Sequence, residues 1–101
     1  MAKPVRKATE TTVPLGSDLR IGRAREVFNM LDAANKPAGK SAMVVIDAAE
    51  VSKIDTAGLQ ALTAAIVRFR TAGTKWRWHN PSPTLTQAAK LLGLDSALEI
   101  E

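Results

Sequence analysis

The spacing of apolar residues changes several times along the chain, and these changes predict strands interleaved with helices. The clearest strand is expected at residues 42–47, where apolar residues follow one another from Met43 to Ile46. A continuous apolar run of this kind is typical of a strand buried on both faces in an α/β protein. Shorter strands are expected at 11–15, at the alternating residues Leu19 and Ile21, and at 75–79.

Three segments repeat apolar residues every three or four positions, which is the spacing of a helix with one buried face. The first two are expected at 23–34 and 57–71, and Gly73 is placed to end the second. The third begins at Ser82 and Pro83, a hydroxyl cap followed by proline at the first helical position. The predicted buried faces are Ala24, Val27, Phe28 and Leu31, then Leu59, Leu62, Ile66 and Phe69, then Leu85, Ala88, Ala89 and Leu92.

The order of these elements predicts the α/β class, with helices covering a sheet. Residues 1–10 are polar and rich in lysine, so we expect a flexible N-terminal tail there. Residues 11–101 are expected to form a single domain. At its end, Leu98 and Ile100 are predicted to add a last short strand or to pack as a tail.

Composition narrows the classes of protein that fit. The chain has 101 residues, enough for one modest core, and no cysteine, which excludes disulfides, thiolate metal ligands and a cysteine nucleophile. The net charge is +4, but the basic residues are scattered along the chain, so we expect no nucleic-acid binding. The longest apolar stretches are too short to span a bilayer, and no apolar segment follows the basic start. We therefore expect a cytoplasmic protein without direct membrane insertion.

The residue types that catalysis needs are not grouped along the chain. His79 is the only histidine, and three carboxylates around one loop, Asp47, Glu50 and Asp55, are more typical of helix caps and solvated charges than of a metal site. Trp76 and Trp78 could bind a small ligand, but tryptophans on one side of a strand usually pack in the core. We expect no enzyme activity, no metal and no cofactor.

The loop between the apolar strand and the second helix is the one local feature that points to a site. Asp55 and Thr56 stand where a helix cap belongs, and Gly58 in the first turn lets another group come close. The amides of that turn carry partial positive charge, which would support a phosphorylated hydroxyl. The alternative is that Asp55 or Thr56 simply caps the helix.

The same loop resembles the signature of the STAS domain family, the family of anti-sigma factor antagonists and of the cytoplasmic tails of sulfate transporters. The shared pattern is an apolar strand, Asp47, an apolar position, Asp55, small or hydroxyl residues, then Gly58 and Leu59. The later helix ends in Leu91-Leu-Gly-Leu94, which is similar to the family's ending, and the resemblance covers about residues 11–100. It implies a STAS-type mixed β-sheet with helices packed mainly on one face.

The resemblance also implies a regulatory function. In anti-sigma factor antagonists, a partner kinase phosphorylates the serine or threonine directly before the glycine and so releases the domain. Here that position is Ala57, which cannot accept a phosphoryl group. Thr56 is the remaining phosphorylation candidate in the motif, and Ser52 is a more remote second one.

Partner docking is therefore expected through the loop and the outward face of the following helix. The expected docking residues are Asp47, Ser52, Asp55, Thr56, Ala57, Gly58, Gln60, Thr63 and Val67. The expected partner is a serine kinase or anti-sigma factor, or a component of bacterial chemotaxis signalling. The chemotaxis partner is suggested by the strand at 75–79, which is similar to that of the small STAS proteins found alongside chemotaxis components. The alternative is a STAS subunit that stabilises the ATPase of a phospholipid ABC transporter.

Overall fold

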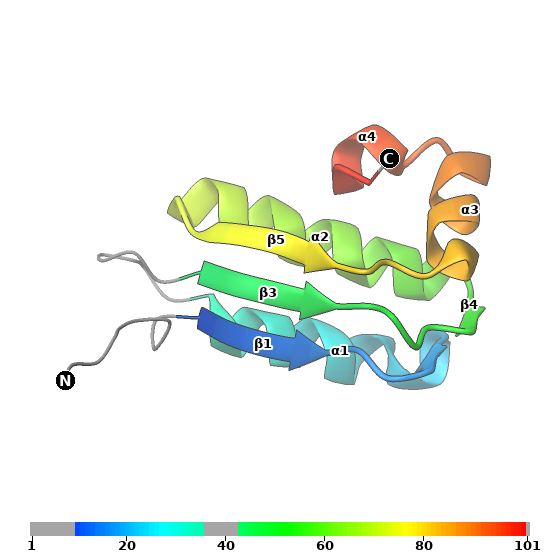
Figure 1. Ribbon diagram of the computed structural model, residues 1–101, viewed down its shortest axis with the longest axis horizontal. Coiled ribbons are helices and arrows are strands. Elements are labelled where there is room, and N and C mark those ends of the chain that lie inside the picture. The colour runs from blue at the N-terminus through cyan, green and yellow to red at the C-terminus, as the bar shows by residue number, and fades with distance from the viewer. Residues whose placement is uncertain (1–9, 36–42, 101) are drawn as a thin grey trace, which may run out of the picture.

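A central parallel sheet with two long helices packed against one face forms the frame of the protein (Figure 1). The computed structural model describes residues 10–35 and 43–100. The elements, in chain order, are β1 (Glu10–Pro14), β2 (Asp18–Leu19), α1 (Ile21–Ala34), β3 (Met43–Asp47), β4 (Lys53–Ile54), α2 (Thr56–Ala72), β5 (Lys75–His79), α3 (Pro83–Leu91) and α4 (Asp95–Leu98).

The larger sheet has the strand order β1-β3-β5, and the two short strands β2 and β4 pair separately at its carboxyl end. In the larger sheet Val13 lies opposite Ile46, and Ile46 lies opposite Trp78. All pairings between the described strands are parallel. The mixed sheet that the resemblance implied would contain at least one antiparallel pair, and the described strands form none. The physical reason is that a helix follows each of the first two main strands and returns the chain to the same end of the sheet.

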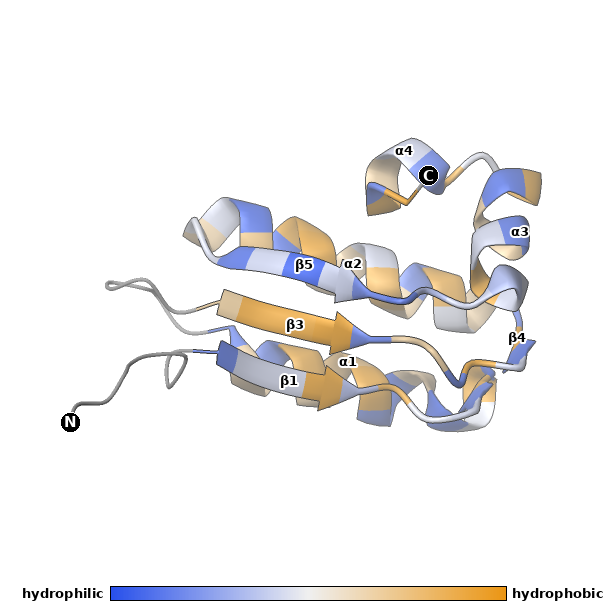
Figure 2. Cartoon of the chain, viewed as in Figure 1, coloured by the Kyte–Doolittle hydropathy of each residue, from blue (hydrophilic) through white to orange (hydrophobic). Residues whose placement is uncertain are grey.

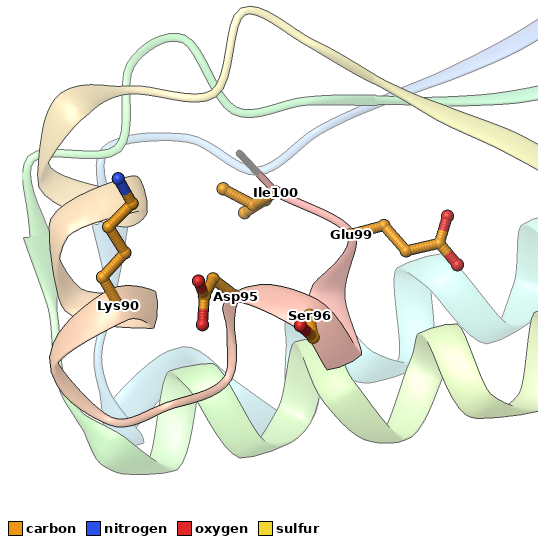
Figure 3. Close-up of a pocket in the computed structure, with 5 residues that line it drawn as sticks. All are labelled: Lys90, Asp95, Ser96, Glu99 and Ile100. Carbon is orange, nitrogen blue, oxygen red and sulfur yellow. The ribbon is translucent and has the colours of Figure 1, made fainter.

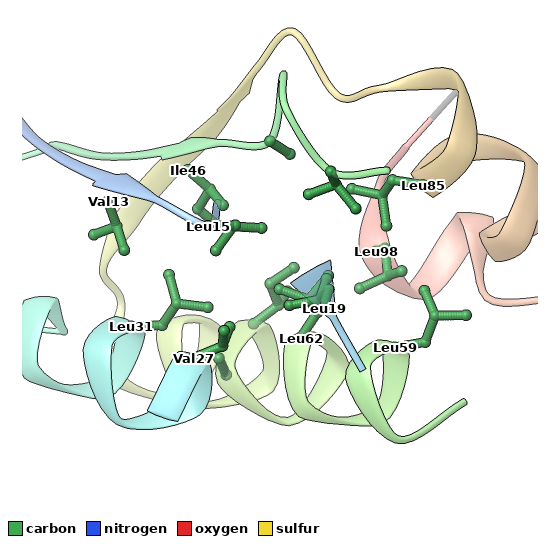
Figure 4. Packing of buried hydrophobic residues seen from close by; sticks show 14 of the residues in the cluster. Val13, Leu15, Leu19, Val27, Leu31, Ile46, Leu59, Leu62, Leu85 and Leu98 are labelled. Carbon is green, nitrogen blue, oxygen red and sulfur yellow. The ribbon is translucent and has the colours of Figure 1, made fainter. Parts of the chain in front are cut away.

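The core lies between the sheet and the helices α1 and α2 (Figures 2 and 4). The expected stripe of α2 is buried in full, as are Val27 and Leu31 on α1. Trp76 and Trp78 are half-buried against this core, as expected for the alternating strand. The α/β class and the packing of helices mainly on one face are therefore confirmed.

The predicted helix ends are also confirmed. Asp55 caps α2, and Gly73 ends it with a left-handed backbone at φ 75°. The Ser82 hydroxyl accepts a hydrogen bond from the Leu85 amide at 3.2 Å, and Pro83 is the first residue of α3. These signals are local in the sequence, which is why they could be recognised before the fold was known.

Other expectations were wrong in detail. Ile21 begins α1 and does not extend the short strand before it. Leu92 is the C-cap of α3 and is 49% exposed, so it does not belong to the buried face of that helix. Of the two alternatives for Leu98 and Ile100, the last strand was wrong because Leu98 lies in the short helix α4, whereas packing is confirmed because both residues are buried. The strand β4 was not predicted at all.

The face of the sheet that points away from α1 and α2 carries mostly polar side chains. Val45 on this face is nevertheless only 4% exposed. Val45 lies opposite Arg77 of β5, and Arg77 forms an ion pair of 3.6 Å with Glu10 of β1, the strand on the other side of β3. The continuous apolar run of β3 therefore corresponds to three buried residues, Val44, Val45 and Ile46, on both faces of the strand.

Candidate functional site

The loop between β3 and α2 is held in place by hydrogen bonds to the loop that follows β1. Asp47 accepts a hydrogen bond from the Ala49 amide at 3.1 Å, which turns the chain directly after β3. The amides of Ser52 and Lys53 both donate to the Ser17 carbonyl, at 2.9 and 3.0 Å. These contacts align β4 beside β2 and bring two loops 35 residues apart to one end of the sheet.

Asp55 joins the N-termini of the two long helices. One carboxylate oxygen accepts a hydrogen bond from the Gly58 amide at 2.9 Å, which caps α2. The other oxygen accepts from the Ile21 amide, also at 2.9 Å, at the first residue of α1. The residue before α1, Arg20, makes no side-chain cap of its own. The sequence predicted the first contact, but the second joins residues 34 positions apart and has no local signal.

Gly58 is buried and lies directly under the backbone of β2. A β-carbon at this position would stand 1.8 Å from the Leu19 carbonyl oxygen, far inside any real contact distance. The close approach that the sequence predicted at Gly58 is thus made by the protein's own chain. Asp55 and Gly58 together position the N-terminus of α2 against β2 and α1.

Two carboxyl groups near this point, Asp55 and Asp18, have lowered pKa values. The amides of Gly58 and Ile21 lower the pKa of Asp55, with smaller effects from the Ala57 amide and Arg20. The guanidinium of Arg20, at 2.8 and 2.9 Å, lowers the pKa of Asp18 from 3.8 to about 2. Both carboxylates are more acidic in the folded protein than in an unfolded chain, so both are ionised at neutral pH.

These pKa shifts predict a fall of stability in acid. A carboxyl group whose pKa is lowered by folding stabilises the protein above its unfolded pKa and loses that effect as the pH falls through the folded value. For Asp18 the loss is expected between about pH 4 and pH 2, the range between its two pKa values. Asp18→Asn should flatten the fall of the unfolding free energy in this range, and Asp55→Asn should flatten it below the unfolded pKa of Asp55, both measured by urea denaturation. An unchanged slope in both variants would contradict these assignments.

The structure separates the predicted docking residues by exposure. Exposed residues are Ser52, Thr56, Gln60 and Val67; half-buried residues are Asp47, Asp55, Ala57 and Thr63; Gly58 is buried. Thr56 is the first residue of α2, and the Thr63 hydroxyl donates to the Leu59 carbonyl at 2.9 Å. Sequence reasoning gave Ile21 no place here, yet it is 73% exposed beside Asp55. Only the contact between the two helix ends identifies it.

A separate hollow lies between α3 and α4 (Figure 3). Its lining residues are Lys90, Asp95, Ser96, Glu99 and Ile100. None of them belongs to the predicted site. Within residues 10–35 and 43–100, no three acidic, histidine or cysteine side chains are grouped as a metal ion would require. The same part of the chain contains no helix that is long and apolar enough to cross a membrane.

The parallel frame and the loop held by Asp55 define a small α/β domain whose distinctive surface is built at the helix N-termini. The family model described as "Mlab, STAS domain" matches residues 4–100, and the chain belongs to the STAS domain family. STAS domains are generally non-catalytic and typically act as regulatory or protein-interaction modules. No curated protein matches the chain.

Solved structures share this fold. A sulfate transporter family protein from Wolinella succinogenes is similar with a TM-score of 0.72 and 19% identity, over 94% of this chain and 75% of that one. The protein TM1081 is similar with a TM-score of 0.69 and 14% identity, over 97% of this chain and 77% of that one. At these identities the likeness shows a common fold.

Proposed function

We propose that this chain is a regulatory, non-catalytic module of the cytoplasm that docks on a signalling protein through the loop 52–58 and the outward face of α2. The partner class is a serine kinase or anti-sigma factor, or a chemotaxis component. The proposal rests on one observation above all: α2 carries no charged residue from Thr56 to Val67. The solvent face of a surface helix usually carries charges, and depletion of charge is typical of interface centres.

The charged residues of α2 lie only near its C-terminal end, and both are engaged within the domain. Arg68 forms an ion pair of 2.6 Å with Asp32 of α1. Arg70 forms one of 2.5 Å with Glu99, beyond α4. The exposed residues between the loop and these pairs are Thr56, Gln60, Ala64 and Val67. They offer a partner an uncharged strip that can be desolvated at low cost.

Thr56 is the residue through which this surface would be controlled. Its side chain is exposed at the start of α2, while the neighbouring Ala57 has no hydroxyl. The Asp55 carboxylate already binds the Gly58 amide of this turn, so a phosphate on Thr56 would add charge to the surface without being needed by the fold. The phosphate would therefore change the binding of the partner and not the fold.

Thr56→Glu is expected to weaken partner binding by at least tenfold and to leave the melting temperature nearly unchanged. The physical reason is that a negative charge must be desolvated in the interface, while at the first position of a helix it is favourable for the fold. The measurement is the dissociation constant of the purified complex, with thermal unfolding of the free variant.

Gln87→Glu is the matched control, because it adds the same charge at an exposed position of α3. It should change neither affinity nor stability. Equal affinities for Thr56→Glu and the unaltered protein would sink the proposal that the start of α2 is the docking surface.

A second candidate function is a STAS subunit that stabilises the ATPase of a phospholipid ABC transporter. The observation that favours it is Ala57, because a constitutive subunit needs no phosphate acceptor before the glycine. Purification of the tagged protein from its native cells after crosslinking, with an intact-mass measurement of the bait, separates the two. Kinase or chemotaxis components with a phosphorylated fraction support the switch, and an ABC ATPase with unmodified bait supports the subunit.

A further inference from the structure

The outer edge of β5 is a second surface that the proposed docking function does not use. β3 occupies one side of β5, and none of the described residues pairs with the other side. Figure 1 likewise draws no strand beyond β5. The backbone N–H and C=O groups along this edge can therefore bind a further strand.

The side chains of β5 define what such a strand would carry. Lys75, Arg77 and His79 are all exposed and point to the face of the sheet without helices. The basic charge is only partly balanced, since Arg77 pairs with Glu10 at 3.6 Å. Acidic side chains opposite these residues would form favourable cross-strand pairs.

The other face of β5 carries two tryptophans that are only partly buried. Trp76 and Trp78 point toward the core but remain half-buried, with their rings in an edge-to-face arrangement at 5.8 Å. The Trp78 ring nitrogen donates to the Leu98 carbonyl at 2.9 Å, so its polar group is already satisfied. Apolar side chains of an added strand would cover indole surface that remains exposed.

We propose that the free edge of β5 binds an extended segment of a partner protein in which acidic and apolar residues alternate. The segment adds as a fourth strand of the larger sheet. Its acidic residues face Lys75, Arg77 and His79, and its apolar residues cover the two tryptophans. A second copy of this chain is a poor occupant, because antiparallel pairing of two β5 strands places like charges opposite each other.

The two tryptophans of the chain both lie on β5, so their fluorescence reports directly on this edge. The probe is a short blocked peptide that alternates glutamate with valine. We expect a saturable blue shift of the emission and slower hydrogen exchange of the β5 amides. Two control peptides should not bind. A lysine–valine peptide carries the wrong charge, and a glutamate–valine peptide with an N-methylated backbone cannot pair as a strand.

Lys75→Glu should weaken binding of the glutamate–valine peptide roughly fivefold, as expected for reversing one cross-strand charge pair. Lys90→Glu is the matched control, because it makes the same exchange at an exposed position of α3, and it should have no effect. Binding of the N-methylated peptide with equal affinity, or unchanged exchange of the β5 amides at saturation, would overturn the proposal. The Thr56 surface is not involved, so either proposal can fail without the other.

Discussion

Gly58→Ala is expected to destabilise the domain by about 3 kcal/mol, which for a domain of this size is a fall of roughly 15 °C in melting temperature. The added methyl group would stand 1.8 Å from the Leu19 carbonyl oxygen. This neighbour is backbone and cannot rotate away, so β2 or the first turn of α2 must shift. Either movement disturbs the Asp55 hydrogen bonds to Gly58 and Ile21.

Gly22→Ala is the control for this variant. Gly22 lies in the first turn of α1, and a β-carbon there would meet no atom within 4 Å. The same chemical change should therefore stabilise the protein by about 0.5 to 1 kcal/mol, because alanine is the better helix former. Thermal and urea unfolding measure both variants. Similar effects of the two substitutions would show that the Leu19 carbonyl of β2 does not lie against Gly58.

Phe69→Ala is expected to cost about 3 to 5 kcal/mol of unfolding free energy, the usual range for removal of a fully buried ring. Phe69 is the largest fully buried side chain of the described residues, and its ring lies 6.4 Å from that of Trp76. Its loss leaves a cavity between α2 and β5 that neither element can close without moving. The midpoint of urea unfolding should fall while the emission of the tryptophans changes.

Val67→Ala provides the comparison from the opposite face of the same helix. Val67 is 48% exposed, so its truncation should change the unfolding free energy by no more than about 0.5 kcal/mol. If Phe69→Ala cost less than about 1 kcal/mol, α2 would not be packed against the sheet in the way described here. The exposed position of Val67 also makes this variant suitable for testing partner binding without loss of the fold.

The candidate site was predictable only in the parts that depend on neighbours in the sequence. The Asp55 cap on α2 connects residues three positions apart, and residue types alone indicate it. The hydrogen bond between Asp55 and Ile21 and the close approach of the Leu19 carbonyl to Gly58 connect segments far apart in the chain. Such contacts have no periodicity, so Ile21 and β4 could not be recognised in advance.

The sequence by itself determined the α/β class, the main helices and strands, their caps at Asp55, Gly73 and Ser82, and the buried stripe of α2. Apolar periodicity and capping chemistry are local properties, and they act before any long-range contact exists. Tertiary structure alone decided that the described strands pair in parallel, that one carboxylate caps two helices, and that no described strand pairs with the outer side of β5. These features depend on which distant segments meet, and packing of the whole chain sets that.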